Sequence, residues 1–324
     1  MVMSVGVIGI EGADPWLLDA LLDPGQNDLV VAGCWSPPRT GTGGCNGARR
    51  NIQHVESLDE LIAAADCLYI GTPVALRLPF ACRAITQHKP VFCEPPLAKD
   101  PAETGHFVRE AQNARVAVNY VTPSIPAITH LRNWLKWAAI GAPYRLNLAP
   151  GRTARVPVLP CPYNGAWQES TLLNDLAPEL LLHYLFLALR LLGILRFQGP
   201  YSAAPYGLCH GAVAFQAGSI PTILSRCTSR RAPEAEPAWT LHGVGAIRLC
   251  GWSTLERAAP DGSWWRETAP LSNHQVRTLA AARQVKELAA LAGGRPHHLA
   301  THFEAYELEA FVSLLRRAGE GTGI

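Results

Sequence analysis

The chain has 324 residues, which is enough for two domains with separate cores, because domains commonly hold on the order of 100–200 residues. Hydrophobic residues make up 48% and charged residues 17%, the composition of an ordinary globular protein. The formal net charge of +2 is too small to indicate nucleic acid or an anionic membrane surface as a partner.

The nine cysteines favour reduced thiols over disulfides or a metal site. None forms a Cys-x-x-Cys pair, and several lie in apolar runs, where a thiol acts as a small hydrophobic group. The first ten residues lack the basic segment and the cleavage site of a secretory leader. We therefore expect a cytoplasmic protein that binds no metal and is not inserted in a membrane.

Short β-branched strands alternate with helical segments in the first part of the chain. Strands are expected at 4–10, 29–35, 66–71, 90–93 and 116–120, and helices are expected to begin near residues 14, 57, 76 and 100. Such alternation predicts βαβ units with a parallel sheet and right-handed crossovers. Residues 1–122 are therefore expected to form a Rossmann-type dinucleotide-binding domain.

The pattern changes after Pro123. Expected next are a helix at 125–139, a strand at 143–148, a long helix through Leu192, and short strands at 212–217, 221–227, 239–243 and 246–251. Strands that follow one another without helices between them indicate an antiparallel sheet. Two amphipathic helices are expected at 273–292 and 301–317. The fold class is therefore α/β, with a parallel-sheet domain followed by an α/β domain over 123–324 whose open sheet is largely antiparallel.

Two motifs in the first domain resemble the Gfo/Idh/MocA oxidoreductases. Residues 69–73 read Tyr-Ile-Gly-Thr-Pro, and residues 91–98 read Val-Phe-Cys-Glu-Pro-Pro-Leu-Ala. The family carries strand-Thr-Pro, a helix and Val-x-x-Glu-Lys-Pro-Leu-Ala in this order, and the resemblance extends from Val5 to about Gly251. It implies NAD(P)-dependent hydride transfer with a small-molecule substrate. It also implies that the second domain binds the substrate and forms a homo-oligomer, a dimer or tetramer, through its sheet.

The resemblance implies a cofactor site at ten positions: Gly9, Ile10, Gly12, Ser36, Arg39, Thr72, Pro73, Glu94, Pro95 and Asn119. In the Gly-rich turn, however, Glu11 and Asp14 take the later glycine positions, where a carboxylate repels a pyrophosphate and crowds its approach. At the end of the second strand, a serine with a nearby arginine suits a 2′-phosphate better than an acidic residue would. NADP(H) is therefore favoured over NAD(H).

The catalytic groups that the resemblance implies are largely replaced. Pro95 stands at the position of the family's lysine, and proline has neither a titratable group nor an N–H. Asp175 matches the family, but Glu179 replaces the histidine one helical turn later, so the two carboxyls are candidates for an acid–base pair. Tyr163 and His183 are further candidates for the proton donor or base. Alternatively, Asp175 caps the helix and His183 is a buried packing residue.

Three functions stay open on this basis. The first is a divergent oxidoreductase that reduces an imine or carbonyl with NADPH, in which the substrate or another side chain supplies the proton. The second is a catalytically degenerate relative that binds a ligand or a partner protein, which the combined losses favour. The third is a non-redox enzyme that reuses the interdomain cleft with Asp175 and Glu179 as acid and base.

Overall fold

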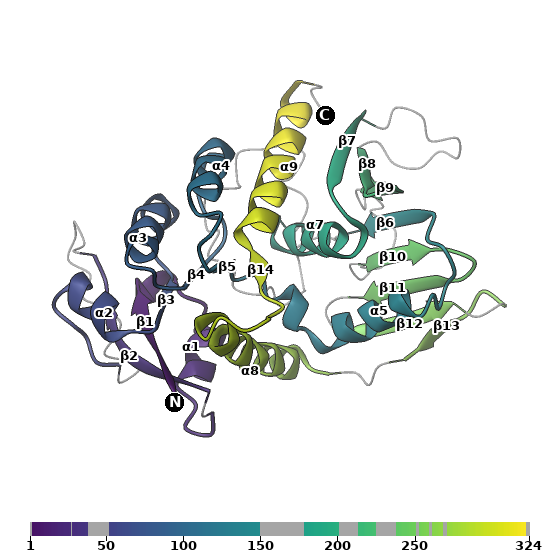
Figure 1. The fold of residues 1–324 in the computed structure, drawn as a ribbon. Coiled ribbons are helices and arrows are strands. Elements are labelled where there is room, and N and C mark those ends of the chain that lie inside the picture. The colour runs from purple at the N-terminus through teal and green to yellow at the C-terminus, as the bar shows by residue number, and fades with distance from the viewer. Residues whose placement is uncertain are drawn as a thin grey trace. The chain divides into compact units, whose positions relative to one another are not determined.

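The computed structural model describes residues 2–26, 28–37, 52–149, 178–200, 213–224, 238–250, 253–258, 261–267 and 271–321. The chain divides into two compact units (Figure 1). Unit 1 comprises Met1–Ser124 and Thr278–Tyr306, and unit 2 comprises Ile125–Arg277 and Glu307–Ile324. The domain boundary predicted after residue 122 lies close to Ser124, where the first segment of unit 1 ends. It differs from the structure for residues 278–306, which return to unit 1.

Unit 1 contains a mostly parallel six-stranded sheet in the order β14-β5-β4-β3-β1-β2. Its strands are β1 (Met3–Ile8), β2 (Leu29–Trp35), β3 (Cys67–Ile70), β4 (Val91–Cys93), β5 (Val116–Val118) and β14 (Ala300–Thr301). The first five strands pair in parallel, and β14 adds to β5 in the antiparallel direction. The Rossmann-type sheet predicted from the sequence is confirmed, and β14 is an addition that the sequence did not indicate.

Helices cover both faces of this sheet: α1 (Pro15–Leu21), α2 (Leu58–Ala64), α3 (Val74–Thr86), α4 (Pro101–Glu110) and the part of α8 (Asn273–Ala292) that lies in unit 1. Alternation along the strands assigns the faces. Val5 and Val7 of β1 lie in one core with side chains of α1 and α8. Gly6, between them, faces Leu61 of α2 on the other side. The arrangement is therefore doubly wound.

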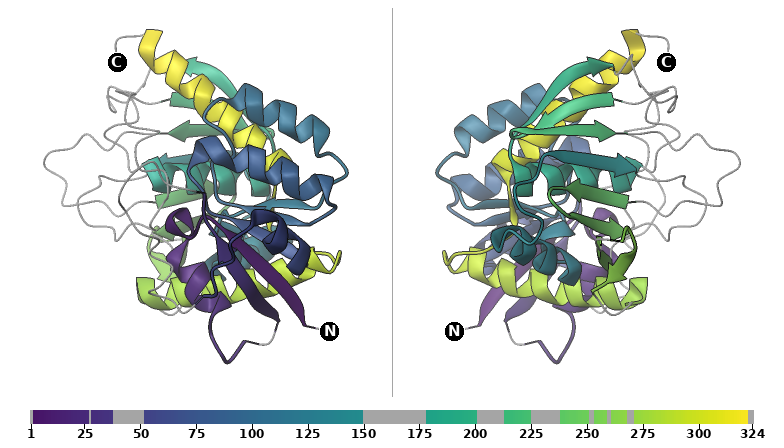
Figure 2. Two further views of the ribbon diagram at one scale, coloured as in Figure 1. Left: turned by 90° about the vertical axis from the view of Figure 1, so that its left-hand side faces the viewer. Right: turned by 90° about the vertical axis from the view of Figure 1, so that its right-hand side faces the viewer.

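Unit 2 is built on an eight-stranded sheet in the order β13-β12-β11-β10-β6-β9-β8-β7. Strands of this sheet are drawn in teal and green in Figure 2. Its strands are β6 (Arg145–Ala149), β7 (Leu195–Pro200), β8 (Val213–Ala217), β9 (Ile220–Leu224), β10 (Ala238–His242), β11 (Ala246–Cys250), β12 (Thr254–Ala258) and β13 (Trp264–Arg266). All the pairs described are antiparallel except β6 with β9. The largely antiparallel sheet is thus confirmed, although β7, β12 and β13 were not anticipated.

Among the described residues, the helices that belong mainly to unit 2 are α5 (Pro126–Lys136), α7 (Pro178–Leu192) and most of α9 (His302–Gly321). Phe311 of α9 packs on Phe215 of β8 with 5.0 Å between the ring centroids.

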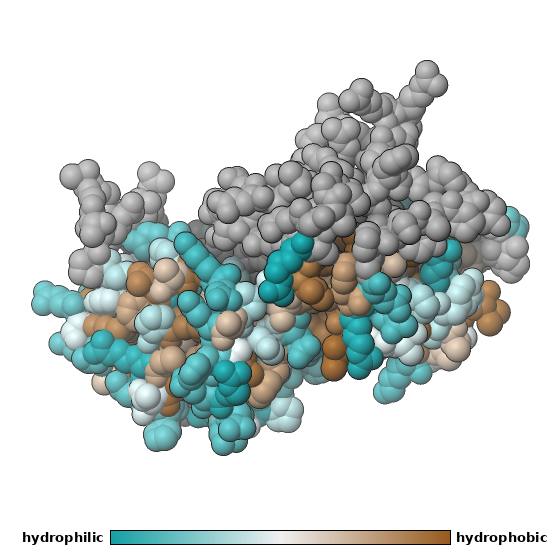
Figure 3. Space-filling view, turned by 90° about the horizontal axis from the view of Figure 1, so that it is seen from above, coloured by the Kyte–Doolittle hydropathy of each residue, from teal (hydrophilic) through white to brown (hydrophobic). Residues whose placement is uncertain are grey.

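On the face shown in Figure 3, hydrophilic and hydrophobic residues are interspersed over the described surface. Within the ranges described above, no helix is both long and apolar enough to cross a membrane.

Candidate functional site

The candidate cofactor side chains meet at one edge of the unit 1 sheet. Ser36 follows β2, Glu94 follows β4 and Asn119 follows β5, and Thr72 is the second residue after β3. The carboxyl ends of parallel strands lie at the same edge, and β1 and β3 are neighbours although β2 comes between them in sequence. Such a switch in strand order is where open α/β sheets bind their ligands. We call this the carboxyl edge.

The turn after β1 lies directly on the end of β3. Gly9 has φ of 77°, a left-handed conformation that favours glycine, and its N–H donates to the Trp35 carbonyl at 2.8 Å. A Cβ at Gly9 would lie 2.5 Å from Cγ2 of Thr72, and one at Gly12 would lie 2.2 Å from the carbonyl oxygen of Gly71. These two glycines are therefore required by the packing of the turn within the protein itself.

The two carboxylates of the turn are each engaged within unit 1. Glu11 lies in the 3-10 turn Ile10–Gly12, and its carboxylate accepts a hydrogen bond from Oγ of Ser36 at 3.0 Å. Asp14 caps α1 by accepting from the N–H of Trp16 at 2.8 Å. Because Pro15 has no N–H and Asp14 occupies the next donor, the end of α1 offers little to a pyrophosphate.

A buried set of polar side chains lies beneath the turn. Asn119 donates from Nδ2 to Oε1 of Glu94 at 2.7 Å, and the Tyr69 hydroxyl donates to the same oxygen in a shorter contact. Gln284 of α8 donates to Oδ1 of Asn119. The N–H of Asp14 reaches both the Tyr69 hydroxyl, at 2.7 Å, and Glu94, at 3.3 Å. We call Tyr69, Glu94, Asn119 and Gln284 the Glu94 cluster.

Burial changes the acidity of this cluster. The Glu94 side chain is only 1% exposed, and desolvation, followed by the nearby Asp14 charge, raises the pKa of its carboxyl to about 7. Hydrogen bonds from Tyr69 and Asn119 and the charge of Arg77 act in the opposite direction. Burial and the Glu94 charge also raise the pKa of Tyr69 well above its usual value. Near neutral pH the cluster therefore gains or loses one proton at Glu94.

Arg77 of α3 ties two loops of the carboxyl edge together. Its side chain is buried, and it donates from Nε to the Thr72 carbonyl at 2.9 Å and from a terminal nitrogen to the Pro96 carbonyl at 2.6 Å. The peptide bond between Pro95 and Pro96 is cis. Both loops are thus held by a cation whose donors are directed at backbone carbonyls.

Two buried polar atoms of this region lack a hydrogen-bond partner among the described residues: Oγ1 of Thr72 and Oε1 of Gln284. Thr72 belongs to the carboxyl edge, and Gln284 supports Asn119 from below. Buried hydroxyl and amide oxygens without a partner are costly, so a ligand that satisfied them would gain binding energy. The Thr72 hydroxyl and the carboxylate beside Ser36 are groups that can pair with the ribose hydroxyls of a dinucleotide, whereas a carboxylate repels its pyrophosphate.

Of the four candidate catalytic residues, His183 is the one whose side chain the structure describes. Arg39, Tyr163 and Asp175 lie outside the described residues, and Glu179 is placed in α7 by its backbone alone. His183 of α7 is buried, and burial together with the charge of Arg277 lowers the pKa of its imidazole to about 4. His183 is therefore uncharged at neutral pH.

Tyr69, Arg77 and Gln284 were not singled out from the sequence. A tyrosine within the apolar strand Cys67–Ile70 and an arginine within the apolar start of α3 are signals that point to buried hydrogen bonding. Gln284 offers no such signal, because its partner Asn119 is 165 residues away in sequence.

No group of three or more metal-ligating side chains occurs among the described residues. Burial raises the pKa of the Cys67 and Cys93 thiols to about 12.

Comparisons with known proteins agree with this fold. Residues 3–121 match the model of the Gfo/Idh/MocA family, an oxidoreductase family with an NAD-binding Rossmann fold. No curated protein matches the chain.

Solved structures that resemble the chain over nearly its whole length show the fold at low identity. An oxidoreductase from Agrobacterium radiobacter, in complex with NAD+, L-tartaric acid and magnesium, is 18% identical with a TM-score of 0.71, covering 100% of this chain and 98% of its own. A biliverdin reductase from Synechocystis, in complex with biliverdin and NADP+, is 16% identical with a TM-score of 0.66, covering 98% of each chain. A 3-ketoreductase from Actinomadura kijaniata, in complex with TDP-benzene and NADP, is 17% identical with a TM-score of 0.66, also covering 98% of each chain. The match over residues 3–121 identifies this part of the chain as similar to the NAD-binding Rossmann domain of the Gfo/Idh/MocA oxidoreductases.

Proposed function

We propose that the protein is an NAD(P)-dependent oxidoreductase whose dinucleotide lies along the carboxyl edge of unit 1. The observation that carries this proposal is the meeting of Ser36, Thr72, Glu94 and Asn119 at one edge of a parallel sheet. The five parallel strands of that sheet, β1 to β5, lie within the residues that match an NAD-binding family. The residues that would hold the dinucleotide are these four, together with the turn after β1.

We further propose that the substrate carries a carbon–nitrogen double bond. A reduced nicotinamide, when bound, supplies a hydride. Pro95 cannot supply the accompanying proton, since it has no titratable group. A protonated imine carries that proton already, so hydride addition at carbon yields an amine without an acid from the protein. A carbonyl substrate needs a proton donor, for which Glu94, protonated in part at neutral pH, is a candidate beside Asp175 and Glu179.

A second function, the binding of a ligand or partner without a dinucleotide, is favoured by one observation. The end of α1 is closed by its own Asp14, whose carboxylate and N–H are both used within unit 1. A phosphate placed there would have to compete with these bonds and with the carboxylate charge.

Titration of the full-length protein with NADH and NADPH separates these two functions. The oxidoreductase proposal expects binding and a rise in melting temperature, because a ligand bound only to the folded state stabilises it. Ser36→Phe, which places a large ring at the end of β2, should weaken binding at least tenfold, while Thr86→Val, in an exposed part of α3, should not. Absence of binding at millimolar dinucleotide would contradict the proposal and favour the second function.

The substrate class is tested separately, once a dinucleotide has been shown to bind. A panel of cyclic imines should be reduced faster than the matching ketones, and the advantage should grow as the pH falls and more imine is protonated. Faster reduction of ketones than of imines across the pH range would contradict the imine proposal without affecting the dinucleotide site.

A further inference from the structure

The carboxylate of Glu11 lies at the end of β2. Ser36, the first residue after this strand, donates from Oγ to Oε2 of Glu11 at 3.0 Å. Glu11 is exposed and Ser36 half-buried, so both are open to a ligand that reaches the end of this strand. The carboxylate is supplied by the turn after β1, 25 residues earlier in the sequence.

Backbone contacts on both sides fix the position from which Glu11 extends. Before it, Gly9 donates its N–H to the carbonyl of Trp35, the last residue of β2, at 2.8 Å. After it, Gly12 packs so closely on the carbonyl of Gly71 that no Cβ fits between them. The turn cannot slide along the sheet without breaking one of these contacts, so Glu11 stays within reach of the end of β2.

A carboxylate at this place has a defined effect on dinucleotides. In Rossmann domains an acidic side chain at the end of the second strand accepts hydrogen bonds from the adenosine ribose hydroxyls, and NADP-binding domains place a cation near the 2′-phosphate instead. Ser36 is uncharged, but its hydroxyl donates a hydrogen bond that orients the carboxylate of Glu11 from the turn. A 2′-phosphate carries about −1.5 to −2 charges at neutral pH, like other phosphate monoesters, and is repelled by a carboxylate within a few ångströms.

We propose that Glu11 is the ribose-binding residue of this protein and that it selects NAD(H) against NADP(H). The inference rests on the proposed dinucleotide site and reverses the preference that Ser36 and Arg39 suggest when the sequence is read alone. The proposal explains two departures from the family pattern together. Glu11 in the Gly-rich turn supplies the carboxylate that is missing at the end of β2, where Ser36 stands.

The test compares dissociation constants of NADH and NADPH for the full-length protein and three variants. The wild type should bind NADH at least tenfold more tightly than NADPH. Glu11→Gln keeps the size of the side chain and removes its charge, so the two constants should become equal within about threefold. Ser36→Ala removes only the hydroxyl that orients the carboxylate and should give a ratio between these values. Glu103→Gln removes an exposed carboxylate in the first turn of α4 and should leave the ratio unchanged.

The outcomes separate this inference from the proposed function. If the wild type binds NADPH as tightly as NADH, or if Glu11→Gln leaves the ratio where it was, Glu11 is not the selective residue although the dinucleotide site stands. If neither dinucleotide binds, the proposed function fails, and this inference fails with it. The fold of each variant is checked by its melting temperature, which should stay close to that of the wild type because Glu11 and Glu103 are exposed and Ser36→Ala removes only a half-buried hydroxyl.

Discussion

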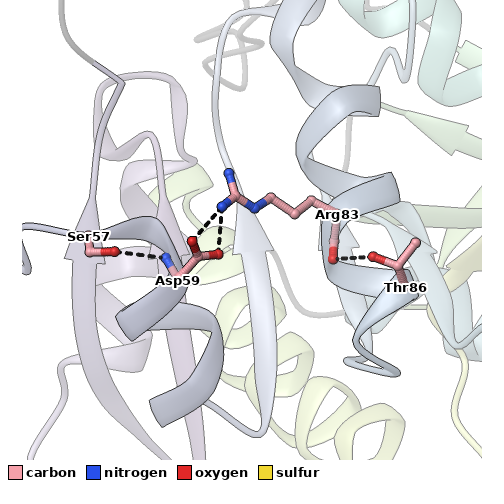
Figure 4. Close-up of polar contacts among 4 residues, drawn as sticks. All are labelled: Ser57, Asp59, Arg83 and Thr86. Carbon is pink, nitrogen blue, oxygen red and sulfur yellow. Dashed lines mark hydrogen bonds and ion pairs between the residues drawn. The ribbon is translucent and has the colours of Figure 1, made fainter.

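Two groups of polar side chains in unit 1 differ mainly in their access to water. In the first group, shown in Figure 4, a terminal nitrogen of Arg83 on α3 lies 2.6 Å from both carboxylate oxygens of Asp59 on α2. These side chains are 46% and 63% exposed. In the second group, the Glu94 cluster, hydrogen bonds of similar length connect side chains that are at most 6% exposed.

The comparison shows that the length of a hydrogen bond does not by itself indicate how much the bond contributes to the free energy of unfolding. Water competes for the exposed ion pair in both the folded and the unfolded protein, so its net contribution is small. In the Glu94 cluster no water replaces a lost partner, so each donor or acceptor left unpaired keeps its full desolvation cost. The following substitutions test this difference, beginning with the largest expected effect.

Asn119→Leu should be the most damaging change. It leaves Glu94 without its Nδ2 donor and Gln284 without its acceptor, in a site closed to water. The free energy of unfolding should fall by about 4 kcal/mol at pH 7. Urea denaturation measures this, with Asn133→Leu in the half-buried part of α5 as control, for which a change under about 1 kcal/mol is expected. Equal losses in the two variants would remove the distinction between the two groups.

Glu94→Gln should change how stability depends on pH. The folded-state pKa of Glu94, about 7, lies above the ordinary value near 4.5, so the folded protein binds the proton more tightly than the unfolded chain. The stabilisation is present in full at low pH and is lost as the pH rises through 7. Relative to the glutamine variant, the wild type should lose on the order of 3 kcal/mol between pH 4.5 and 8. Parallel pH profiles of the two proteins would show that Glu94 does not titrate in this range.

Substitutions of Asp14 should have smaller and separable effects. Asparagine caps a helix as well as aspartate does, so Asp14→Asn should leave stability nearly unchanged at low pH. It should lower the pKa of Glu94, because the Asp14 charge contributes to its rise, and so make the protein slightly more stable above pH 7. Asp14→Ala removes the cap and should cost about 1 kcal/mol. Thermal unfolding across pH measures both effects. A midpoint for Glu94 that is unchanged in Asp14→Asn would contradict the electrostatic part of the explanation.

Arg83→Ala should have the smallest effect. The free energy of unfolding should fall by less than about 1 kcal/mol, and the difference should shrink further in 1 M salt, where the Debye length is about 3 Å. Urea denaturation at low and high salt checks this. A loss as large as that of Asn119→Leu would mean that exposure does not separate the two groups.

Much of the fold of unit 1 could be predicted from the sequence, because buried parallel strands are continuous apolar runs and the caps Asp14 and Asp100 mark helix starts. Strands with weaker patterns were missed for physical reasons. β7 ends in Gly199 and Pro200, and β13 is three residues long and lies at the edge of the sheet, where it pairs with β12. Such segments carry too few apolar residues for periodicity to be visible.

The candidate site was predictable to the extent that it follows strand ends. Ser36, Thr72, Glu94 and Asn119 each lie within two residues of a strand, so their common edge follows from the parallel sheet. The partners of these residues could not be predicted, because they come from elsewhere in the chain. Gln284 returns to unit 1 from a helix far along the sequence, and the direction of the Glu11 side chain depends on how the turn packs against Gly71.

Hydrogen–deuterium exchange of the full-length protein, with and without saturating NADH, tests the dinucleotide site most directly. Slower exchange of backbone amides should be centred on the turn at residues 9–14 and on the strand ends at residues 36 and 72, with smaller changes in peptides that cover α4. Unchanged exchange in the turn and at those strand ends would contradict a dinucleotide at the carboxyl edge.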